Sequence, residues 1–434
     1  MAARQRRMRP LAAVLLLAAM GPLRAAAPAP DGLIASPEPG WPQWRGPRRD
    51  AISNETGLLP AWPEGGPALL WKIDDLGQGW SSPIIVKGTV YVTGDSGGDL
   101  VLYAFDLDGK PMWRVANGRA WTGSFPGARA CGAYSEGALY HMNAHGRVAA
   151  FDASTGKELW AVEVLERFES RNITWAMSEC LLVDGPRLVV TPGGPKTLMA
   201  ALDKTDGRTV WTSEPIADET ASYCSPILFR QSGRRFLTNC TSHHAWGVDA
   251  DTGRLLWTVP LRNPHGVTIT TPVYGEGCVF YVTPDGPGGS LYRIGGDPPG
   301  TRVELAWKTA VDTLTSGGVL VDGLLFANGC KLSKTLHCID WKSGETKYEL
   351  PRVMSKQPRW AAGASVWAQG RLHCLIEDGR VVLLEPKPDG FAVAGQFQLA
   401  DVKRADAWAH PVLLDGRLYL RYHGTLWCYD VRAR

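Results

Sequence analysis

The sequence predicts an all-β protein, an eight-bladed β-propeller built from four-stranded blades. Three observations support this prediction. First, a pair of apolar strands around a glycine turn recurs eight times. Second, most copies are followed, at similar spacing, by an aspartate, a glycine and a tryptophan. Third, the strand that is missing from the last copy precedes the first copy. The 49 glycines among 434 residues also mark the frequent turns that many short strands require.

The turn glycines set the size of the repeat. They are 49, 48, 48, 44, 46, 47 and 46 residues apart, and they are Gly88, Gly137, Gly185, Gly233, Gly277, Gly323, Gly370 and Gly416. Four strands in roughly 47 residues is the size of one propeller blade, and eight blades lie within the known range. Because a single blade cannot bury its own faces, the blades are expected to stack in a ring.

The second half of each repeat is illustrated by "FDASTGKELW", which runs from Phe151 to Trp160. Its aspartate suits the capping of a turn by a side chain, and its glycine supplies a backbone angle that other residues resist. The tryptophan is expected to lie between blades and to bury roughly 200 Å² of surface. The residues predicted to staple blades in this way are Trp71, Trp113, Trp160, Trp211, Trp257 and Trp307. Tyr348 takes this place in the sixth repeat, and the seventh has lost it.

The two ends of the repeat region predict how the ring closes. The eighth repeat ends at "LWCYDVRAR", where its tryptophan-bearing strand is due, and "PALLWKIDDLG" with Trp71 precedes the first full repeat. The N-terminal strand is therefore expected to complete the last blade. This arrangement leaves no open edge between the first and last blades.

The N-terminal region predicts export. A basic start, the apolar run "LAAVLLLAAM" and the small residues of "RAAAPAP" are typical of a signal peptide, here residues 1–27 with cleavage near Ala26 or Ala27. The apolar run is too short for a membrane anchor, and Sec and twin-arginine export both remain open. Residues 28–67 are expected to form an irregular leader, a strap on the side or bottom of the ring with its charges in solvent. Residues 68–434 are expected to form the propeller.

Charge and cysteine content limit the kinds of partner. A net charge of +3 is too small for a chain of this length to indicate electrostatic binding of nucleic acid, and we expect a monomer. Nine cysteines leave at least one thiol unpaired within the chain, and Cys330 and Cys338 are the nearest pair by position. No spacing of cysteines and histidines predicts a zinc site.

Aromatic residues and arginines gather on the loops that lead from one blade to the next. In a propeller these loops lie at one mouth of the channel, where function usually resides. The candidate ligand-binding residues are Trp80, Arg129, Trp175, Tyr223, His265, Arg359, Trp360 and Trp408. The turns within blades at the same end add His243, His244, Asp285, Lys331, Glu377 and His423.

Indole rings and guanidinium groups together suit a planar or an anionic ligand, and a sugar ring or an extended peptide fits the same chemistry. The alternative is that these tryptophans plug the channel and pack the loops. Because His243 and His244 are adjacent, they are expected to face opposite sides of a strand rather than share a metal ion. We assign no catalytic residue and no metal ligand.

The pattern D-x-x-T-G-x-x-x-W resembles the tryptophan-docking repeat of the pyrroloquinoline-quinone (PQQ) propellers, and the resemblance extends from Trp71 to Arg434. That superfamily includes quinoprotein alcohol dehydrogenases and the propeller lipoprotein of outer-membrane assembly. The segment "WPQWRGP" from Trp41 looks like the leader of a bacterial, exported group of PQQ-like repeat proteins. The resemblance implies a periplasmic protein and, if the enzymes' chemistry is kept, PQQ held with calcium.

Three features of those relatives are missing from this sequence. It has no adjacent pair of cysteines for a vicinal disulfide, no C-x-x-C-H motif for haem, and no cysteine near the cleavage site for a lipid anchor. The sequence therefore predicts a scaffold without catalysis of its own, which binds a ligand, a protein or a glycan at the channel mouth. A dehydrogenase that uses PQQ and calcium, and a carbohydrate-binding propeller, are the alternatives.

Overall fold

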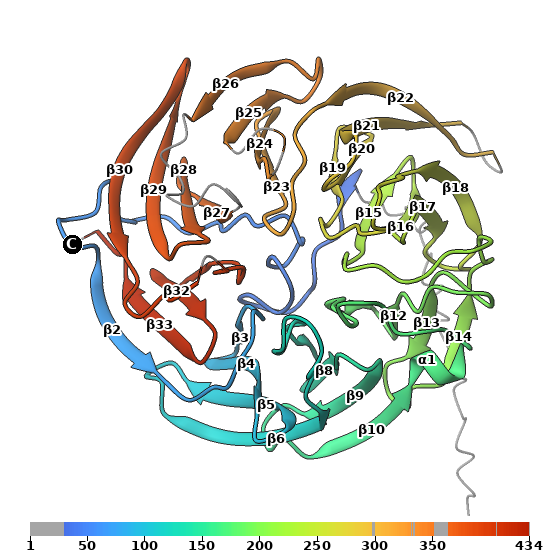
Figure 1. Cartoon of the computed structure of the whole chain (residues 1–434), viewed down its shortest axis with the longest axis horizontal. Helices are drawn as coiled ribbons and strands as arrows, with labels where there is room; N and C mark the ends of the chain where they lie inside the picture. Colours follow the sequence, from blue (N-terminus) through green and yellow to red (C-terminus); the bar gives the residue numbers. More distant parts are fainter. Residues whose placement is uncertain are drawn as a thin grey trace, which may run out of the picture.

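The computed structural model describes residues 30–296, 300–330, 332, 335–350, 363–404 and 406–433. These residues form eight antiparallel sheets around one axis, and each sheet is a blade with its outermost strand at the circumference (Figure 1). The predicted eight-bladed, all-β propeller is confirmed. The predicted signal peptide, residues 1–27, lies outside the described residues. No helix among the described residues is both long and apolar enough to cross a bilayer.

Blades 1 to 4 follow one another along the chain, each running from its innermost strand outwards. Blade 1 contains β3 (Ile84–Val86), β4 (Thr89–Ser96), β5 (Asp99–Asp106) and β6 (Pro111–Arg119). Blade 2 contains β7 (Ala133–Ser135), β8 (Ala138–Met142), β9 (Arg147–Asp152) and β10 (Glu158–Glu163), which the short helix α1 (Val164–Arg167) follows. Blade 3 contains β11 (Leu182–Asp184), β12 (Arg187–Val190), β13 (Ala200–Asp203) and β14 (Thr209–Thr212). Blade 4 contains β15 (Ile227–Gln231), β16 (Arg234–Cys240), β17 (His244–Asp249) and β18 (Leu255–Pro260).

Blades 5 to 8 continue in the same sense around the ring. Blade 5 contains β19 (Val273–Gly275), β20 (Cys278–Thr283), β21 (Gly288–Gly295) and β22 (Arg302–Thr309). Blade 6 contains β23 (Gly318–Val321), β24 (Leu324–Asn328), β25 (Leu336–Asp340) and β26 (Thr346–Leu350). Blade 7 contains β27 (Gly363–Ala368), β28 (Arg371–Ile376), β29 (Arg380–Lys387) and β30 (Gly390–Gln398). Blade 8 contains β31 (Val412–Leu414), β32 (Arg417–Tyr422), β33 (Thr425–Asp430) and, outermost, β2 (Ala68–Ile73).

Blade 8 is assembled from both ends of the described chain. Strand β2 pairs with β33 in antiparallel register, from Ala68 opposite Asp430 to Ile73 opposite Leu426. The N-terminal strand thus completes the last blade, as predicted. Strand β1 (Gly32–Leu33) pairs with the innermost strand of blade 4 and gives that sheet a fifth strand.

The recurring glycine of each repeat lies in the turn between the first two strands of a blade. In blade 2, Glu136 and Gly137 have φ values of 50° and 86°, and in blade 6, Asp322 and Gly323 have values of 50° and 74°. Two successive residues with positive φ are typical of the type I′ turn, whose twist matches that of the paired strands. Glycine adopts such an angle without steric cost, which explains its recurrence.

Each outermost strand carries an irregularity directly before its tryptophan, or before the residue that replaces it. In blade 2, for example, the register against β9 shifts between Glu158 and Trp160. A β-bulge of this kind bends the strand and re-aims its side chains. The bulge directs the indole away from its own sheet and toward the next blade.

Five of the six indoles, all but Trp257, pack on the glycine turn of the following blade. Trp113 Nε1 donates to Ala153 O at 3.0 Å, and Trp160 Nε1 donates to Lys204 O at 3.0 Å. A Cβ added at Gly156 would lie 2.7 Å from the Trp113 ring, so only glycine leaves room for the indole. The same packing joins Trp71 to Gly109, Trp160 to Gly207, Trp211 to Gly253 and Trp307 to Gly344.

The aspartate of the repeat holds that turn in shape. Asp152 Oδ1 accepts the backbone N–H groups of Ser154 at 3.0 Å and Thr155 at 2.9 Å. The hydroxyls of Ser154 and Thr155 also donate to it, and these bonds lower the pKa of Asp152. Asp106, Asp203, Asp249 and Asp340 cap their turns in the same way. The aspartates therefore organise turns, as their pattern predicted.

Where the repeat departs from the pattern, other aromatic contacts replace the indole on glycine. Trp257 Nε1 donates to the hydroxyl of Tyr281 in blade 5 at 3.2 Å. Tyr348 of blade 6 packs edge-on against Phe391 of blade 7, with ring centroids 5.0 Å apart. Aromatic packing between neighbouring blades thus continues at these two junctions.

The leader crosses the ring and contacts every blade. Figure 1 shows it as the dark blue segment that runs across the centre. Residues 34–59 of the leader form at least one hydrogen bond with each blade, in or beside its strands. The partners in blades 1 to 8 are, in order, Ile85, Tyr134, Leu181, Leu228, Thr271, Gly318, Trp367 and Val431. A segment without strand periodicity therefore ties all eight blades together.

Two arginines of the leader are buried, so the prediction that its charges lie in solvent is wrong. Arg45 and Arg49 are each 3% exposed. Arg49 donates to Cys180 O at 2.7 Å and Leu181 O at 3.0 Å, and Arg45 donates to Gly318 O. Burial lowers the pKa of both arginines, to about 10 for Arg45. Backbone carbonyls near the axis satisfy these cations in place of water.

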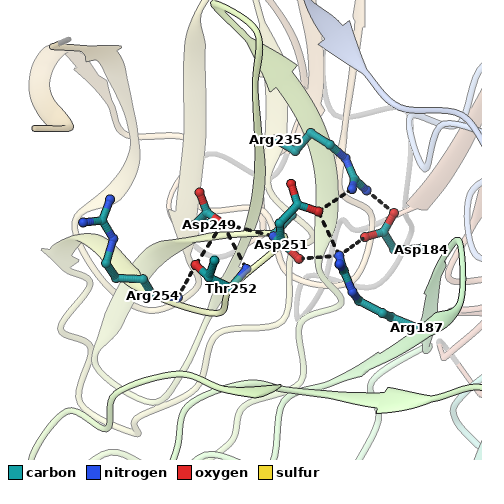
Figure 2. Close-up of polar contacts among 8 residues, drawn as sticks. Asp184, Arg187, Arg235, Asp249, Asp251, Thr252 and Arg254 are labelled. Carbon is teal, nitrogen blue, oxygen red and sulfur yellow. Dashed lines mark hydrogen bonds and ion pairs between the residues drawn. The ribbon is translucent and has the colours of Figure 1, made fainter. Parts of the chain in front are cut away.

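An ion-pair network joins blades 3 and 4 at the end of the ring opposite the blade-to-blade loops (Figure 2). Asp251 accepts from Arg187 at 2.9 Å and from Arg235 at 2.7 Å, and both arginines also pair with Asp184. Asp249 caps the turn that presents Asp251. Because the network links strands of two blades, it adds to the indole contact, although partly exposed ion pairs stabilise a fold only modestly.

The indole-on-glycine contact predicts different costs for two alanine substitutions in blade 2. Gly137→Ala introduces a Cβ at positive φ with nothing within 4 Å, whereas the Cβ of Gly156→Ala also meets the Trp113 ring. We expect Gly156→Ala to lower the free energy of unfolding by about 1–3 kcal/mol more than Gly137→Ala. Urea unfolding measures both values. In a Trp113→Leu background the excess should disappear, and equal costs in the native background would contradict the contact.

Candidate functional site

The loops that join the outermost strand of one blade to the innermost strand of the next all lie at one end of the ring, here called the mouth. This follows from the antiparallel order of each sheet, which returns the chain to the same end after four strands. The loops carry six of the eight predicted residues within the described part: Trp80, Arg129, Trp175, Tyr223, His265 and Trp408. Arg359 and Trp360 lie outside the described residues.

Three of the predicted residues meet at the junction of blades 8, 1 and 2. The rings of Trp80 and Trp408 lie 5.2 Å apart at an angle of 33°. The Arg129 guanidinium lies 5.4 Å from the Trp80 ring, in the range of a cation–π contact. His423 packs edge-on against Trp80 at 5.3 Å, and Trp80 is only 9% exposed. These side chains therefore cover one another at the centre of the cluster.

Phe125 forms the exposed surface of this cluster and was missed by the sequence analysis. It packs on Trp408 at 5.6 Å, yet 50% of its surface is exposed. Its φ of 54° is rare for an aromatic residue. Arg129 donates to the carbonyls of Ser124, Phe125 and Gly127 and so holds the loop in this shape. Nothing in the sequence pattern marks a strained loop residue of this kind.

A buried polar layer lies beneath the cluster. Arg421 is fully buried, donates to Ser81 O and His423 O at 2.9 Å each, and has its pKa lowered to about 9 by burial. Burial raises the pKa of Asp95 to about 6, although nearby Arg129 and Arg421 favour its charged form. The arginine interrupts the apolar strand "LYLRY", and that interruption is the signal by which the sequence could have revealed it.

Two carboxylates fix the other members of the cluster. Trp408 Nε1 donates to Glu377 Oε1 at 2.6 Å, and His423 Nε2 lies 3.2 Å from Asp406 Oδ2. Glu377 and His423 were both predicted at this end of the ring. Their contacts orient the indole and the imidazole from below, so these rings are held by packing and by polar bonds together.

The remaining predicted residues lie apart from this centre. Trp175 and Tyr223 form a second aromatic pair at 5.9 Å, and the Trp175 N–H donates to the Tyr223 hydroxyl at 3.2 Å. Burial raises the pKa of Tyr223, and the hydrogen bond from Trp175 and the charge of Arg129 partly oppose this. His265 lies exposed on the loop between blades 4 and 5, where its backbone N–H donates to Asn263 at 3.0 Å.

His243 and His244 both approach one buried carboxylate. Their Nδ1 atoms lie 3.7 Å and 2.6 Å from Glu219 Oε1. The prediction that they face opposite ways is wrong, because β17 begins only at His244 and strand alternation does not extend to His243. Lys331 lies outside the described residues, and Asp285 is in the turn between β20 and β21.

The described mouth residues do not fit PQQ held by calcium. Calcium takes about six to eight oxygen ligands, usually with carboxylates among them. Across the described ranges, no three side chains of histidine, cysteine, aspartate or glutamate are grouped so as to hold one metal ion. The Trp80 ring, which would offer a stacking face, is covered by Trp408, Arg129 and His423.

Comparison with known proteins identifies relatives of two kinds. The family described as outer membrane protein assembly factor BamB matches residues 98–350, more than half of the 434 residues. The chain is 22% identical over 270 residues to outer membrane protein assembly factor BamB of Yersinia pestis. It is 26% identical over 163 residues to 1-butanol dehydrogenase (quinone) of Thauera butanivorans. These alignments span 62% and 26% of the two relatives, less than two thirds of either.

Two solved structures share the architecture. BamB from Moraxella catarrhalis matches with a TM-score of 0.59 and 14% identity, over 84% of this chain and 99% of that one. Quinohemoprotein alcohol dehydrogenase from Comamonas testosteroni matches with a TM-score of 0.61 and 13% identity, over 92% and 82%. At these identities the likeness shows the fold alone.

A buried carboxyl on a mouth loop predicts a stability that falls as pH rises. Glu179 is 1% exposed, accepts from Thr191 N at 2.8 Å, and has its pKa raised by burial from 4.5 to about 8. Between these values the unfolded chain releases a proton that the folded chain keeps. The free energy of unfolding should therefore fall by roughly 1.4 kcal/mol per pH unit across this range.

Urea unfolding of the native chain and of Glu179→Gln, from about pH 5 to about pH 8, measures this slope. Glutamine keeps the shape of the side chain and its acceptor for Thr191. The difference in slope between the two proteins isolates Glu179 from other titrating groups. Parallel profiles would mean that Glu179 is ionised in the folded protein.

Proposed function

Because this chain belongs to the propeller family described as outer membrane protein assembly factor BamB, we propose that it is an exported scaffold that binds a partner protein at its mouth and performs no chemistry of its own. The observation that carries the proposal is a half-exposed aromatic residue, Phe125, held in a strained conformation above a closely packed centre. Backbone strain that the surrounding structure maintains is characteristic of functional sites.

The groups inside the ring support a binding surface rather than a deep pocket. Trp44 of the leader packs on His410 with ring centroids 4.3 Å apart. His410 Nε2 lies 2.8 Å from Thr315 O, and burial lowers the pKa of His410 to about 3, which keeps it neutral. Trp44 and His410, whose side chains lie between the leader and the mouth, are thus already in contact with other residues of the chain.

The chemistry of the mouth favours a protein segment with an apolar anchor. Aromatic residues dominate the energy of protein interfaces, and they do so best where the surface is already rigid. Phe125 is exposed to contact a partner, and Trp408 and Arg129 hold it from beneath. Trp175 and Tyr223 extend the aromatic surface across the next two loops.

The rival functions are a PQQ-dependent dehydrogenase and a carbohydrate-binding propeller. Similarity to 1-butanol dehydrogenase (quinone) favours the first, whereas the covered indole faces and the absence of a metal-binding group among the described residues count against it. Exposed aromatic rings are also compatible with the second.

Photo-crosslinking tests the partner proposal. A photoreactive phenylalanine analogue at Phe125 is expected to give one discrete adduct with a single exported protein in the native host. The matched control is Met112, which is 51% exposed on the outermost strand of blade 1 and should give none. Binding of the purified partner to Phe125→Ala should weaken about 30-fold, the loss expected for an interface anchor. Equal crosslinking at both positions would contradict a specific surface at the mouth.

Calorimetric titration with PQQ, with and without calcium, separates the enzyme from the scaffold. We expect no heat of binding under either condition, because the Trp80 face is covered and the described residues offer no group of carboxylates for the ion. Calcium-dependent binding at a ratio of one to one would overturn the proposal and would justify assays with alcohols. Titration with oligosaccharides tests the third function in the same way.

A further inference from the structure

Two buried cysteines of neighbouring blades face each other near the axis of the ring. Cys131 lies two residues before β7 of blade 2, and Cys180 lies two residues before β11 of blade 3. Their Sγ atoms are 3.3 Å apart, and the backbone N–H of Cys131 donates to Cys180 Sγ at 3.4 Å. They are 1% and 3% exposed. From this geometry we propose that Cys131 and Cys180 form a disulfide that joins blades 2 and 3 in the exported protein.

The bond requires only a small movement. A disulfide is about 2.05 Å long, so the two sulfur atoms need to approach by roughly 1.3 Å, within the reach of side-chain rotation. The backbone around Cys180 is already held on both sides. Its N–H donates to Ser225 Oγ at 3.0 Å, and its carbonyl accepts from Arg49 at 2.7 Å. Cys131 and Cys180 are both reduced in this structure, as is Cys338 of the pair nearest in sequence.

The surroundings assign different roles to the two thiols. Burial opposes ionisation of Cys180, but the Cys131 thiol donates to it and the Arg49 guanidinium lies nearby, so its pKa is lowered. Burial raises the pKa of Cys131. The thiolate is the nucleophile in disulfide exchange, so Cys180 is expected to attack first and Cys131 second, once the two blades have met and before the thiols are closed off from the oxidant.

The oxidant is an external disulfide, either a protein disulfide or oxidised glutathione. The Cys180 thiolate attacks one of its sulfurs, forms a mixed disulfide and releases the first external thiolate, which takes up a proton. Cys131 then loses its proton, attacks the Cys180 sulfur and expels the second external thiolate, which is also protonated. The chain loses two hydrogens in all, and the external disulfide becomes two thiols. Because both cysteines are buried in the folded state, the exchange takes place while the chain folds.

The cross-link joins two residues that are 49 positions apart, next to an anchor of the leader. Arg49, which reaches across from the leader, binds the carbonyls of Cys180 and Leu181 directly beside the bond. A disulfide stabilises a protein mainly by restricting the unfolded chain. For a chain of this size, oxidation should raise Tm by about 4 °C.

Peptide mapping of the purified chain tests the bond directly. The protein is refolded with oxidised glutathione or with a phosphine reductant, unfolded with an alkylating reagent present, and digested without reduction. After oxidation we expect a peptide pair linked through Cys131 and Cys180, two hydrogens lighter than the separate peptides. Alkylation of both cysteines after oxidation, or a link of either one to another cysteine such as Cys224 or Cys240, would overturn the proposal.

Thermal unfolding supplies a second readout that does not depend on the digest. Cys131→Ser and Cys180→Ser should each abolish the Tm difference between the oxidised and the reduced protein. Cys374→Ser is the matched control, because Cys374 is also buried and has Ser365 Oγ, not a cysteine, as its neighbour at 3.1 Å. It should keep the difference of about 4 °C. A difference that survives in Cys131→Ser would assign the stabilisation to another pair.

Discussion

The packing of an indole from one blade on the glycine turn of the next is the contact on which this ring depends. Three local features make it possible. A bulge turns the tryptophan out of its own sheet, an aspartate fixes the receiving turn, and a glycine leaves space for the ring. The contact that closes the ring is of the same kind, since Trp71 of blade 8 donates to Leu107 O of blade 1 at 2.8 Å. These contacts join successive blades around the ring, and the contact between blade 8 and blade 1 closes it.

The mouth depends on that closure. Trp408, Trp80 and Arg129 belong to the loops that enter blades 8, 1 and 2, the region where the two ends of the propeller meet. Arg421 of blade 8 reaches Ser81, which precedes blade 1, and so connects the two sides beneath the aromatic cluster. The leader adds a second set of ties from within the ring. Surface chemistry at the mouth and mechanical stability of the ring therefore rest on the same few contacts.

The sequence predicts most of the fold because the fold repeats. Eight copies of one pattern reveal the strands, the hairpin turns, the capping aspartates and the N-terminal strand of blade 8. The leader has no such copies, and its buried arginines are invisible to periodicity because their partners are backbone carbonyls on distant blades. The mouth can be predicted from the sequence only in part. Its aromatic residues stand out in the sequence, but their packing, the strain at Phe125 and the buried Arg421 depend on which loops adjoin in space.

The path of the leader sets the order in which this protein can be completed. Glu55 binds the backbone of Gly416 across 361 positions of the chain, and the first strand of the propeller pairs with the last. Such distant contacts slow folding, because a long loop must close, at a cost in entropy, before the contacts can stabilise the fold. The leader has to wait until the final strand has left the ribosome before the last of its partners exist. Early blades can form and stack during synthesis. The contacts of the leader and the aromatic cluster at the mouth are completed only when the ring closes.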